Sequence, residues 1–264
     1  WAGTMYAGYN YDLHRCAILG RMLDQYQWVA DIEQFDYPPL DNRTDPHDLL
    51  VFSISLDNWV GAARWAVDAS ESERINRWNL DCVGAFGIPR LAFLESERPE
   101  AAFERDGQWL RVYGDIEPGF FQRFQRALDA NPDASIVVLG SGGGSVRDAI
   151  LAGAEIRRRG LETTLHGNCY SACPLVFVGG VRRVLWASPH RLGFHQISID
   201  RAAVDLDHPI YSVVARYLAS MGVEPVTVIS WMFSASPAEM FEPEVGDLCR
   251  PGVATFVQRI CGWD

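Results

Sequence analysis

The spacing of apolar residues changes about a third of the way along the chain. Up to about residue 90, apolar side chains recur every three or four positions, which is typical of the buried face of a helix. The residues that carry this period near the start are Leu13, Cys16, Leu19, Leu23, Tyr26 and Val29. Ser70 and Glu73 form a capping box, which predicts the start of a further helix. We therefore expect a helical N-terminal extension over residues 1–90.

Beyond about residue 91, short apolar runs alternate with amphipathic stretches. The apolar runs predict strands at residues 109–113, 135–139, 161–165, 181–185 and 192–195. Helices are expected from Phe120 to the Asn131–Pro132 pair, at residues 146–159 before Gly160, near Ser171, and at residues 210–218 before Gly222. Repeated strand–helix–strand units predict an α/β domain over residues 91–264, with a mostly parallel sheet and right-handed crossovers.

Charge and composition narrow the classes of partner. The formal net charge of −11 disfavours nucleic acid and anionic membrane surfaces, because both require a basic protein surface. No run of about eighteen apolar residues occurs, so the sequence predicts no membrane span. The chain begins at Trp1 rather than Met, which favours a mature or trimmed form and leaves room for a leader or membrane anchor before Trp1.

The six cysteines form an even set, which suits disulfides and a periplasmic or otherwise exported protein. Cys249 and Cys261 bracket a short segment near the C-terminus and are the first pair that we expect to be joined. The sequence does not choose among the remaining pairings.

Three short motifs supply the parts that nucleophilic acyl transfer needs, namely a hydroxyl, a base and free amide N–H groups. The motifs are VVLGSGGGSV at residues 137–146, GNCYSAC at 167–173 and LGFHQ at 192–196. Glycines 142–144 permit positive φ and close approach of a substrate backbone. Ser171 is expected at a helix N-terminus, near free N–H groups and the positive end of the helix dipole. A histidine ordinarily titrates near neutral pH, as a general base should, and His195 is the candidate for that role.

Each motif also has a purely structural interpretation. Ser171 would be a helix N-cap, which is the commonest use of such a serine, and His195 would be a hydrogen-bonded histidine within a sheet. Glycines 142–144 would form a phosphate-binding nest, but no Lys-Ser/Thr pair follows them, which argues against a nucleotide P-loop. The three motifs in this order favour the catalytic interpretation.

At these residues the chain resembles the proteolytic subunit of the Clp protease and its exported bacterial relatives, within the ClpP/crotonase superfamily. The resemblance covers about residues 109–248. GSGGG at 140–144 stands where the family has Asn-Ser-Pro-Gly-Gly, residues 167–172 match its Gly-x-x-x-Ser-x turn, and residues 194–196 match its apolar-His-Gln strand. The resemblance implies an α/β fold with a ClpP/crotonase-like core of repeated β-β-α spiral units and a mostly parallel sheet, beside the helical N-terminal region.

The resemblance also implies roles for single residues. Ser171 would be the nucleophile and His195 its general base. An extended peptide would add as a strand between the glycine loop and the histidine strand. The residues that would hold the oxyanion or the substrate backbone are Gly143, Gly144, Ala172 and Gln196. The implied protein is an ATP-independent serine peptidase that acts on peptides or proteins and forms homo-oligomers. We expect no metal ion and no cofactor.

The chain departs from the family pattern in two places. Gly142 replaces a proline, which loosens the turn. The family's acidic partner of the histidine is an Asp on a later segment, and the matching stretch here, residues 238–244, contains none. Glu239 is our candidate to orient His195, because Glu can replace Asp in that role. Asp200 is a rival, and a Ser–His dyad or an inactive relic are further alternatives.

Cys169 and Cys173 flank the serine. The sequence leaves open a local disulfide, disulfides to distant cysteines, and buried thiols. A metal site with His166 is a weaker alternative, because His-x2-Cys-x3-Cys matches no common zinc spacing and lacks a fourth ligand.

Two other classes of function compete with a peptidase. One is an inactive ClpP-fold module that binds a peptide or partner, and the missing Asp favours it. The other is a crotonase-type acyl-CoA enzyme, which needs no serine, but the sequence has no basic cluster for the CoA phosphates.

Overall fold

The computed structural model describes residues 13–33, 44–83, 86–94, 100–186, 190–200 and 202–262. The chain divides into two compact units, Trp1–Pro99 and Glu100–Asp264. All three disulfides lie within a unit, and none joins one unit to the other.

The first unit is helical in its described part. Its elements are a helix at residues 13–22, α2 (Tyr26–Val29), η1 (Ala30–Glu33), α3 (Pro46–Asp68), α4 (Glu71–Arg77), η2 (Trp78–Cys82) and η3 (Arg90–Ala92). The predicted capping box is confirmed, since the Ser70 side chain accepts from the Glu73 N–H and Glu73 accepts from the Ser70 N–H. A Cys16–Cys82 disulfide joins the first helix to η2 beside the fully buried Trp78.

The second unit is built on one mostly parallel sheet. Its strands run in the order β1-β2-β3-β4-β5-β9, and β6 also pairs with β4. The bounds are β1 (Ala102–Asp106), β2 (Trp109–Tyr113), β3 (Ile136–Ser141), β4 (Glu162–Tyr170), β5 (Arg183–Leu185), β6 (Leu192–Gly193) and β9 (Phe256–Val257). Among the strand pairs that the described residues form in this sheet, β1–β2 is antiparallel and the others are parallel. A separate antiparallel hairpin consists of β7 (Ser198–Ile199) and β8 (Ala202–Ala203).

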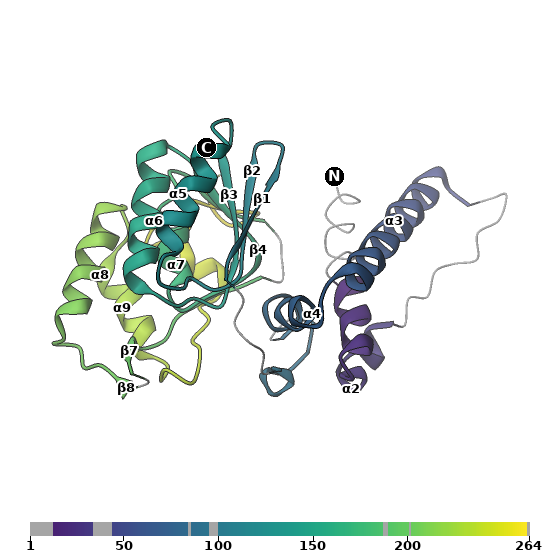
Figure 1. Cartoon of the computed structure of the whole chain (residues 1–264), viewed down its shortest axis with the longest axis horizontal. Helices are drawn as coiled ribbons and strands as arrows, with labels where there is room; N and C mark the ends of the chain where they lie inside the picture. Colours follow the sequence, from purple (N-terminus) through teal and green to yellow (C-terminus); the bar gives the residue numbers. More distant parts are fainter. Residues whose placement is uncertain are drawn as a thin grey trace. The chain divides into compact units, whose positions relative to one another are not determined.

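Helices of the second unit stack beside this sheet. They are α5 (Phe120–Ala130), α6 (Val146–Arg159), α7 (Cys173–Phe177), α8 (Pro209–Ser220) and α9 (Pro225–Phe233), followed by the short η4 (Val245–Leu248). In Figure 1, α5 and α6 lie along one side of strands β1–β4, and α8 and α9 lie beyond α6. The Tyr217 hydroxyl of α8 donates to the Leu175 carbonyl of α7 over 2.6 Å and so ties these layers together.

The predicted α/β class with a mostly parallel sheet is confirmed, as are most of its elements. Helix α6 ends where expected, with Gly160 as a left-handed C-cap. The sequence pattern missed β1, whose side chains are largely exposed and show no apolar period, and it missed α9. Strand β4 continues five residues beyond the expected end at Leu165 and reaches Tyr170. None of the helices in the described part of the chain combines the length and the apolar character that a membrane-spanning helix needs.

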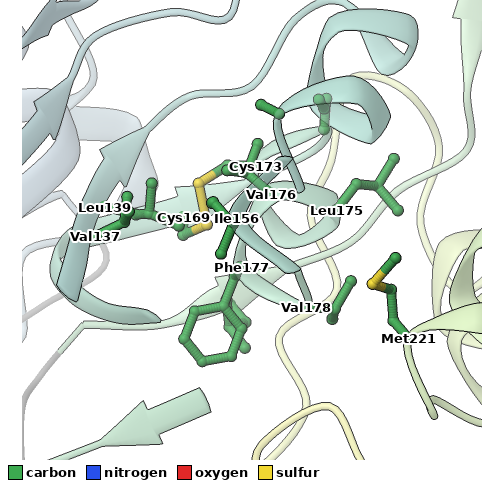
Figure 2. Packing of buried hydrophobic residues seen from close by; sticks show 14 of the residues in the cluster. Val137, Leu139, Ile156, Cys169, Cys173, Leu175, Val176, Phe177, Val178 and Met221 are labelled. Atoms are coloured by element: carbon green, nitrogen blue, oxygen red, sulfur yellow. A yellow bond between two sulfur atoms is a disulfide. The ribbon is translucent and has the colours of Figure 1, made fainter. Parts of the chain in front are cut away.

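The core of the second unit reaches the end of β4 and the start of α7. Figure 2 shows the Cys169–Cys173 disulfide packed among apolar side chains of β3, α6 and α7, including Leu139, Ile156 and Val176. Both cysteines are fully buried. The local disulfide, one of three alternatives open from the sequence, is therefore the one present, and Cys249–Cys261 is confirmed as a pair.

Candidate active site

The three sequence motifs meet at the carboxyl ends of neighbouring parallel strands. In the sheet register, Ser141 at the end of β3 lies opposite Cys169 of β4, and Tyr170 of β4 lies opposite Gly193 of β6. The residues that follow each strand are therefore brought together at one edge of the sheet, where α/β proteins commonly bind ligands.

The glycine loop follows β3 and approaches the serine turn closely. Gly143 and Gly144 have φ values of +99° and +135°, which only glycine adopts without strain. A Cβ on Gly143 would lie 2.8 Å from the Ala172 nitrogen, and one on Gly144 would lie 2.4 Å from the Ile116 carbonyl oxygen. Both positions therefore need glycine for space as well as for backbone conformation.

Ser171 lies in the two-residue turn between β4 and α7, with a left-handed φ of +60°. This conformation costs a residue with a Cβ about 1–2 kcal/mol, so the surroundings must hold it. The Ser171 N–H donates to the Gly193 carbonyl over 3.0 Å, and the Cys169–Cys173 disulfide spans the turn. The N-cap of α7 is Ala172, without a side-chain cap, so Ser171 does not serve as the N-cap.

His195 follows β6 and faces Ser171. Its Nε2 lies 2.6 Å from the Ser171 Oγ, and its Nδ1 lies 3.0 Å from the carbonyl oxygen of Pro237. A carbonyl oxygen only accepts, so Nδ1 carries the proton. The bare Nε2 then accepts the hydrogen bond of the Ser171 hydroxyl, which is the tautomer that a general base needs.

The protonation state of His195 suits the same role. Burial of the ring lowers the pKa of His195 below the ordinary value of 6.5, while hydrogen bonds to the backbone of Pro237 and Ser236 act in the opposite sense. The imidazole is therefore neutral at neutral pH and able to take up a proton.

The acidic residues considered from the sequence lie elsewhere. Glu239 Oε2 accepts from the Ser236 hydroxyl over 2.8 Å, and no hydrogen bond joins Glu239 to His195. Asp200 lies exposed in the turn after β7, with a φ of +51°. Among the described residues, no carboxylate is hydrogen-bonded to His195; the carbonyl of Pro237 takes that place.

The Gly143 and Ala172 N–H groups, which are expected to bind an oxyanion, differ in whether they already donate a hydrogen bond. The Gly143 N–H donates to the Ser141 Oγ over 3.1 Å. Ser141 is buried, so this acceptor is held in place. Among the described residues, none accepts a hydrogen bond from the Ala172 N–H. Of the two expected oxyanion donors, the Gly143 N–H would therefore have to exchange its acceptor first, whereas the Ala172 N–H would not.

The expected substrate edge beside the histidine is partly occupied by the chain itself. Phe194 and Phe241 exchange two backbone hydrogen bonds of 2.8 Å, and the Gln196 N–H donates to the Ala235 carbonyl over 3.0 Å. The Gln196 N–H is therefore already engaged by residues 235–241. Next to this segment, the Tyr170 hydroxyl donates to Glu242 over 2.8 Å.

Sequence reasoning missed Pro237, Ser236 and Ser141. Pro237 contributes only a carbonyl oxygen, which every residue has, so no residue-type signal could have found it. Ser141 was visible in the GSGGG motif as the residue two positions before Gly143, a spacing at which serine hydroxyls commonly accept a backbone hydrogen bond. The disulfide also takes both sulfurs of Cys169 and Cys173 away from the metal site considered with His166.

Comparison with known proteins gave structural similarities only. No protein-family model and no curated protein sequence matches the chain. The chain is similar to ClpP1 from Listeria monocytogenes, with a TM-score of 0.46 and 14% identity over 58% of this chain and 91% of that one. It is similar to the membrane-bound stomatin-specific protease 1510-N, with a TM-score of 0.39 and 13% identity over 55% of this chain and 73% of that one.

A putative enoyl-CoA hydratase from Streptomyces avermitilis is also similar, with a TM-score of 0.42 and 10% identity over 61% of this chain and 68% of that one. Similarity at this level assigns no activity to this chain.

Proposed function

We propose that this chain is a serine hydrolase of the ClpP-like kind, acting as a peptidase through Ser171 and His195. The observation that carries the proposal is the 2.6 Å contact between the His195 Nε2 and the Ser171 Oγ, made by a serine in a left-handed turn. A serine used only as a cap or a surface hydroxyl does not need a strained backbone, whereas strained residues cluster at active sites.

In the proposed reaction, the Ser171 Oγ attacks the carbonyl carbon of the substrate while the His195 Nε2 accepts the hydroxyl proton. The Ala172 N–H donates to the resulting oxyanion, and the Gly143 N–H joins it once it leaves the Ser141 Oγ. The imidazolium then gives its proton to the leaving amine, and an ester of Ser171 remains. Water activated by His195 attacks this ester and releases the acid.

We expect the substrate to be an extended peptide that adds as a strand beside the glycine loop. Glycine at positions 143 and 144 lets this loop lie against the serine turn and Ile116, because a Cβ at either position would collide with the protein's own backbone. Three disulfides support an oxidising compartment, in line with the expected periplasmic or other exported location. Homo-oligomers stay a prediction, which light scattering of the purified chain would test.

A fluorophosphonate probe with intact-mass readout tests the proposal. The wild type should gain one adduct that peptide mapping places on Ser171. Ser171→Ala should gain none, and His195→Gln should react at least about a hundredfold more slowly. Peptide libraries then define the cleaved bond. A folded wild type that gains no adduct, in both its oxidised and its reduced state, would contradict an active hydrolase.

An inactive peptide-binding module is the second candidate. The engagement of the Gly143 N–H by Ser141 and of the Gln196 N–H by Ala235 favours it, because both groups must be released before a substrate can use them. Peptides selected for binding separate the two candidates. An inactive module would bind them equally well before and after Ser171→Ala and would return them uncleaved from the wild type.

A further inference from the structure

The segment that carries the acceptor of the His195 Nδ1 is attached to the histidine strand at both ends. The Ala235 carbonyl accepts from the Gln196 N–H at one end, and Phe241 pairs with Phe194 at the other. Residues 236–240 lie between these two attachments and stand opposite His195 alone, so the segment forms a bulge. The bulge brings the Pro237 carbonyl oxygen to 3.0 Å from the His195 Nδ1.

The shape of this bulge is set by bonds between two of its residues. The Glu239 N–H donates to the Ser236 carbonyl over 3.0 Å, which closes a turn around Pro237. The Ser236 hydroxyl donates to Glu239 Oε2 over 2.8 Å, and the Ser236 N–H points to the same oxygen at 3.4 Å. Three contacts thus join the residues on either side of Pro237.

We propose that Ser236 and Glu239 position His195 indirectly, by holding the Pro237 carbonyl that takes the place of the acidic third member of a catalytic triad. The inference rests on the proposed hydrolase function of Ser171 and His195. Glu239 is then a positioning residue, and it contributes through its oxygen atom as an acceptor rather than through its negative charge.

The alternative is a direct triad acid, in which the Glu239 carboxylate turns to His195 when substrate binds. The two roles make opposite demands on the side chain. A turn clamp needs an acceptor for the Ser236 hydroxyl, and the amide oxygen of Gln provides one. A triad acid needs a carboxylate, since replacing the acid of a triad by its amide costs roughly 10⁴ in rate.

The test is a set of four variants compared by the second-order rate of fluorophosphonate labelling. Glu239→Gln should label within about threefold of the wild type, because it keeps the acceptor. Glu239→Ala and Ser236→Ala should each fall about ten- to a hundredfold, which is the effect of misplacing a reacting group by up to about 1 Å. Glu244→Gln is the matched control. The Glu244 carboxylate is exposed, lies nearby in the chain and makes no capping hydrogen bond to η4, so this variant should label like the wild type.

Coupling between the two residues gives a second criterion. The double variant Ser236→Ala, Glu239→Ala should label no more slowly than Glu239→Ala alone, because Glu239→Ala already removes the contact that Ser236→Ala removes. A fall of roughly 10⁴ in Glu239→Gln would overturn the proposal in favour of a triad acid. Wild-type rates in Glu239→Ala and Ser236→Ala would overturn it as well.

A spectroscopic measurement keeps this result separate from the proposed function. The NMR signal of the His195 Nδ1 proton, assigned by its absence in His195→Gln, should persist in Glu239→Gln and be lost or broadened in Glu239→Ala. If the wild type takes no label, the hydrolase proposal fails, and this signal still decides the positioning proposal. An unchanged Nδ1 proton signal in Glu239→Ala would overturn the positioning proposal.

Discussion

A Cβ atom on Gly143 would lie 2.5 Å from the Cβ of Ser171, closer than real Cβ atoms approach one another. The glycine loop and the serine turn are therefore in direct contact. Gly143→Ala must either push the loop away from Ser171 or turn the serine out of its left-handed conformation. We expect fluorophosphonate labelling of Gly143→Ala to fall at least about a hundredfold, since the reacting groups are displaced.

Alanine substitutions at two other glycines are controls that distinguish the effect of this collision from the effect of backbone strain. Gly107 also has a positive φ, of +59°, but a Cβ there meets nothing within 4 Å, so Gly107→Ala carries strain without collision. Gly246 has neither constraint. Gly107→Ala should lose about 1–2 kcal/mol of stability and keep its labelling rate, and Gly246→Ala should keep both. Equal labelling rates in all three variants would show that the contact does not matter for the site.

The disulfide around Ser171 should matter more for activity than for stability. Cys169 and Cys173 are four positions apart, and Cys249 and Cys261 are twelve apart. By loop-closure entropy the shorter loop contributes about 2 kcal/mol and the longer about 3 kcal/mol. The shorter loop, however, contains both Ser171 and Ala172, the nucleophile and an oxyanion donor of the proposed reaction.

We therefore expect the variant Cys169→Ala, Cys173→Ala to label at least about tenfold more slowly than the wild type at 25 °C. Cys249→Ala, Cys261→Ala is the matched control and should label within about twofold of the wild type despite the larger stability loss. Thermal unfolding of both variants verifies that they are folded during labelling. Parallel losses of activity and stability in the two variants would contradict a specific role for the first disulfide.

The sequence could single out Ser171 and His195, the proposed nucleophile and base, because each is a distinctive residue type in a strand-end motif. It could not predict the partner of the His195 Nδ1, because the Pro237 carbonyl belongs to the backbone and is placed by contacts more than forty residues away in the chain. The same limit applies to β1, whose exposed side chains give no apolar pattern and which exists through pairing with β2. For Cys169 and Cys173, spacing allowed a local disulfide but gave no preference for it.

Burial of His14 in the N-terminal unit should make stability depend on pH. Its ring is fully buried and lies 4.7 Å from the ring of Trp59, and burial lowers the pKa of His14 from 6.5 to about 4. The folded-state pKa is lower than the unfolded one, so the unfolded chain binds the proton first. This contribution to stability is complete above pH 6.5 and is lost as the pH falls towards 4, by about 2 kcal/mol at pH 5.

Urea unfolding of the wild type and of His14→Gln at pH 7.5 and pH 5 measures this effect. The wild type should lose about 2 kcal/mol more than His14→Gln between the two pH values, because only the wild type gains the proton on unfolding. The comparison removes the shared effect of carboxylates that titrate over the same range. Equal losses in the two proteins would mean that His14 takes up its proton in the folded state as readily as in the unfolded one.

The pH dependence of labelling tests the neutral partner of His195. A carboxylate next to the ring would raise the pKa of the histidine. Without one, burial of the ring outweighs the opposing hydrogen bonds to the backbone and lowers the pKa of His195 below 6.5. The base works only when it is unprotonated, so the labelling rate should fall with decreasing pH and should reach half its plateau value below pH 6.5. The second-order rate constant between pH 4.5 and 8.5, taken for the wild type and Glu239→Gln, measures this midpoint.

A midpoint at pH 7 or above in the wild type that moves down in Glu239→Gln would identify Glu239 as the charge that faces the imidazolium. A midpoint below pH 6.5 in both proteins is expected if the Pro237 carbonyl is the partner, since neutralising Glu239 then removes no charge in contact with the ring.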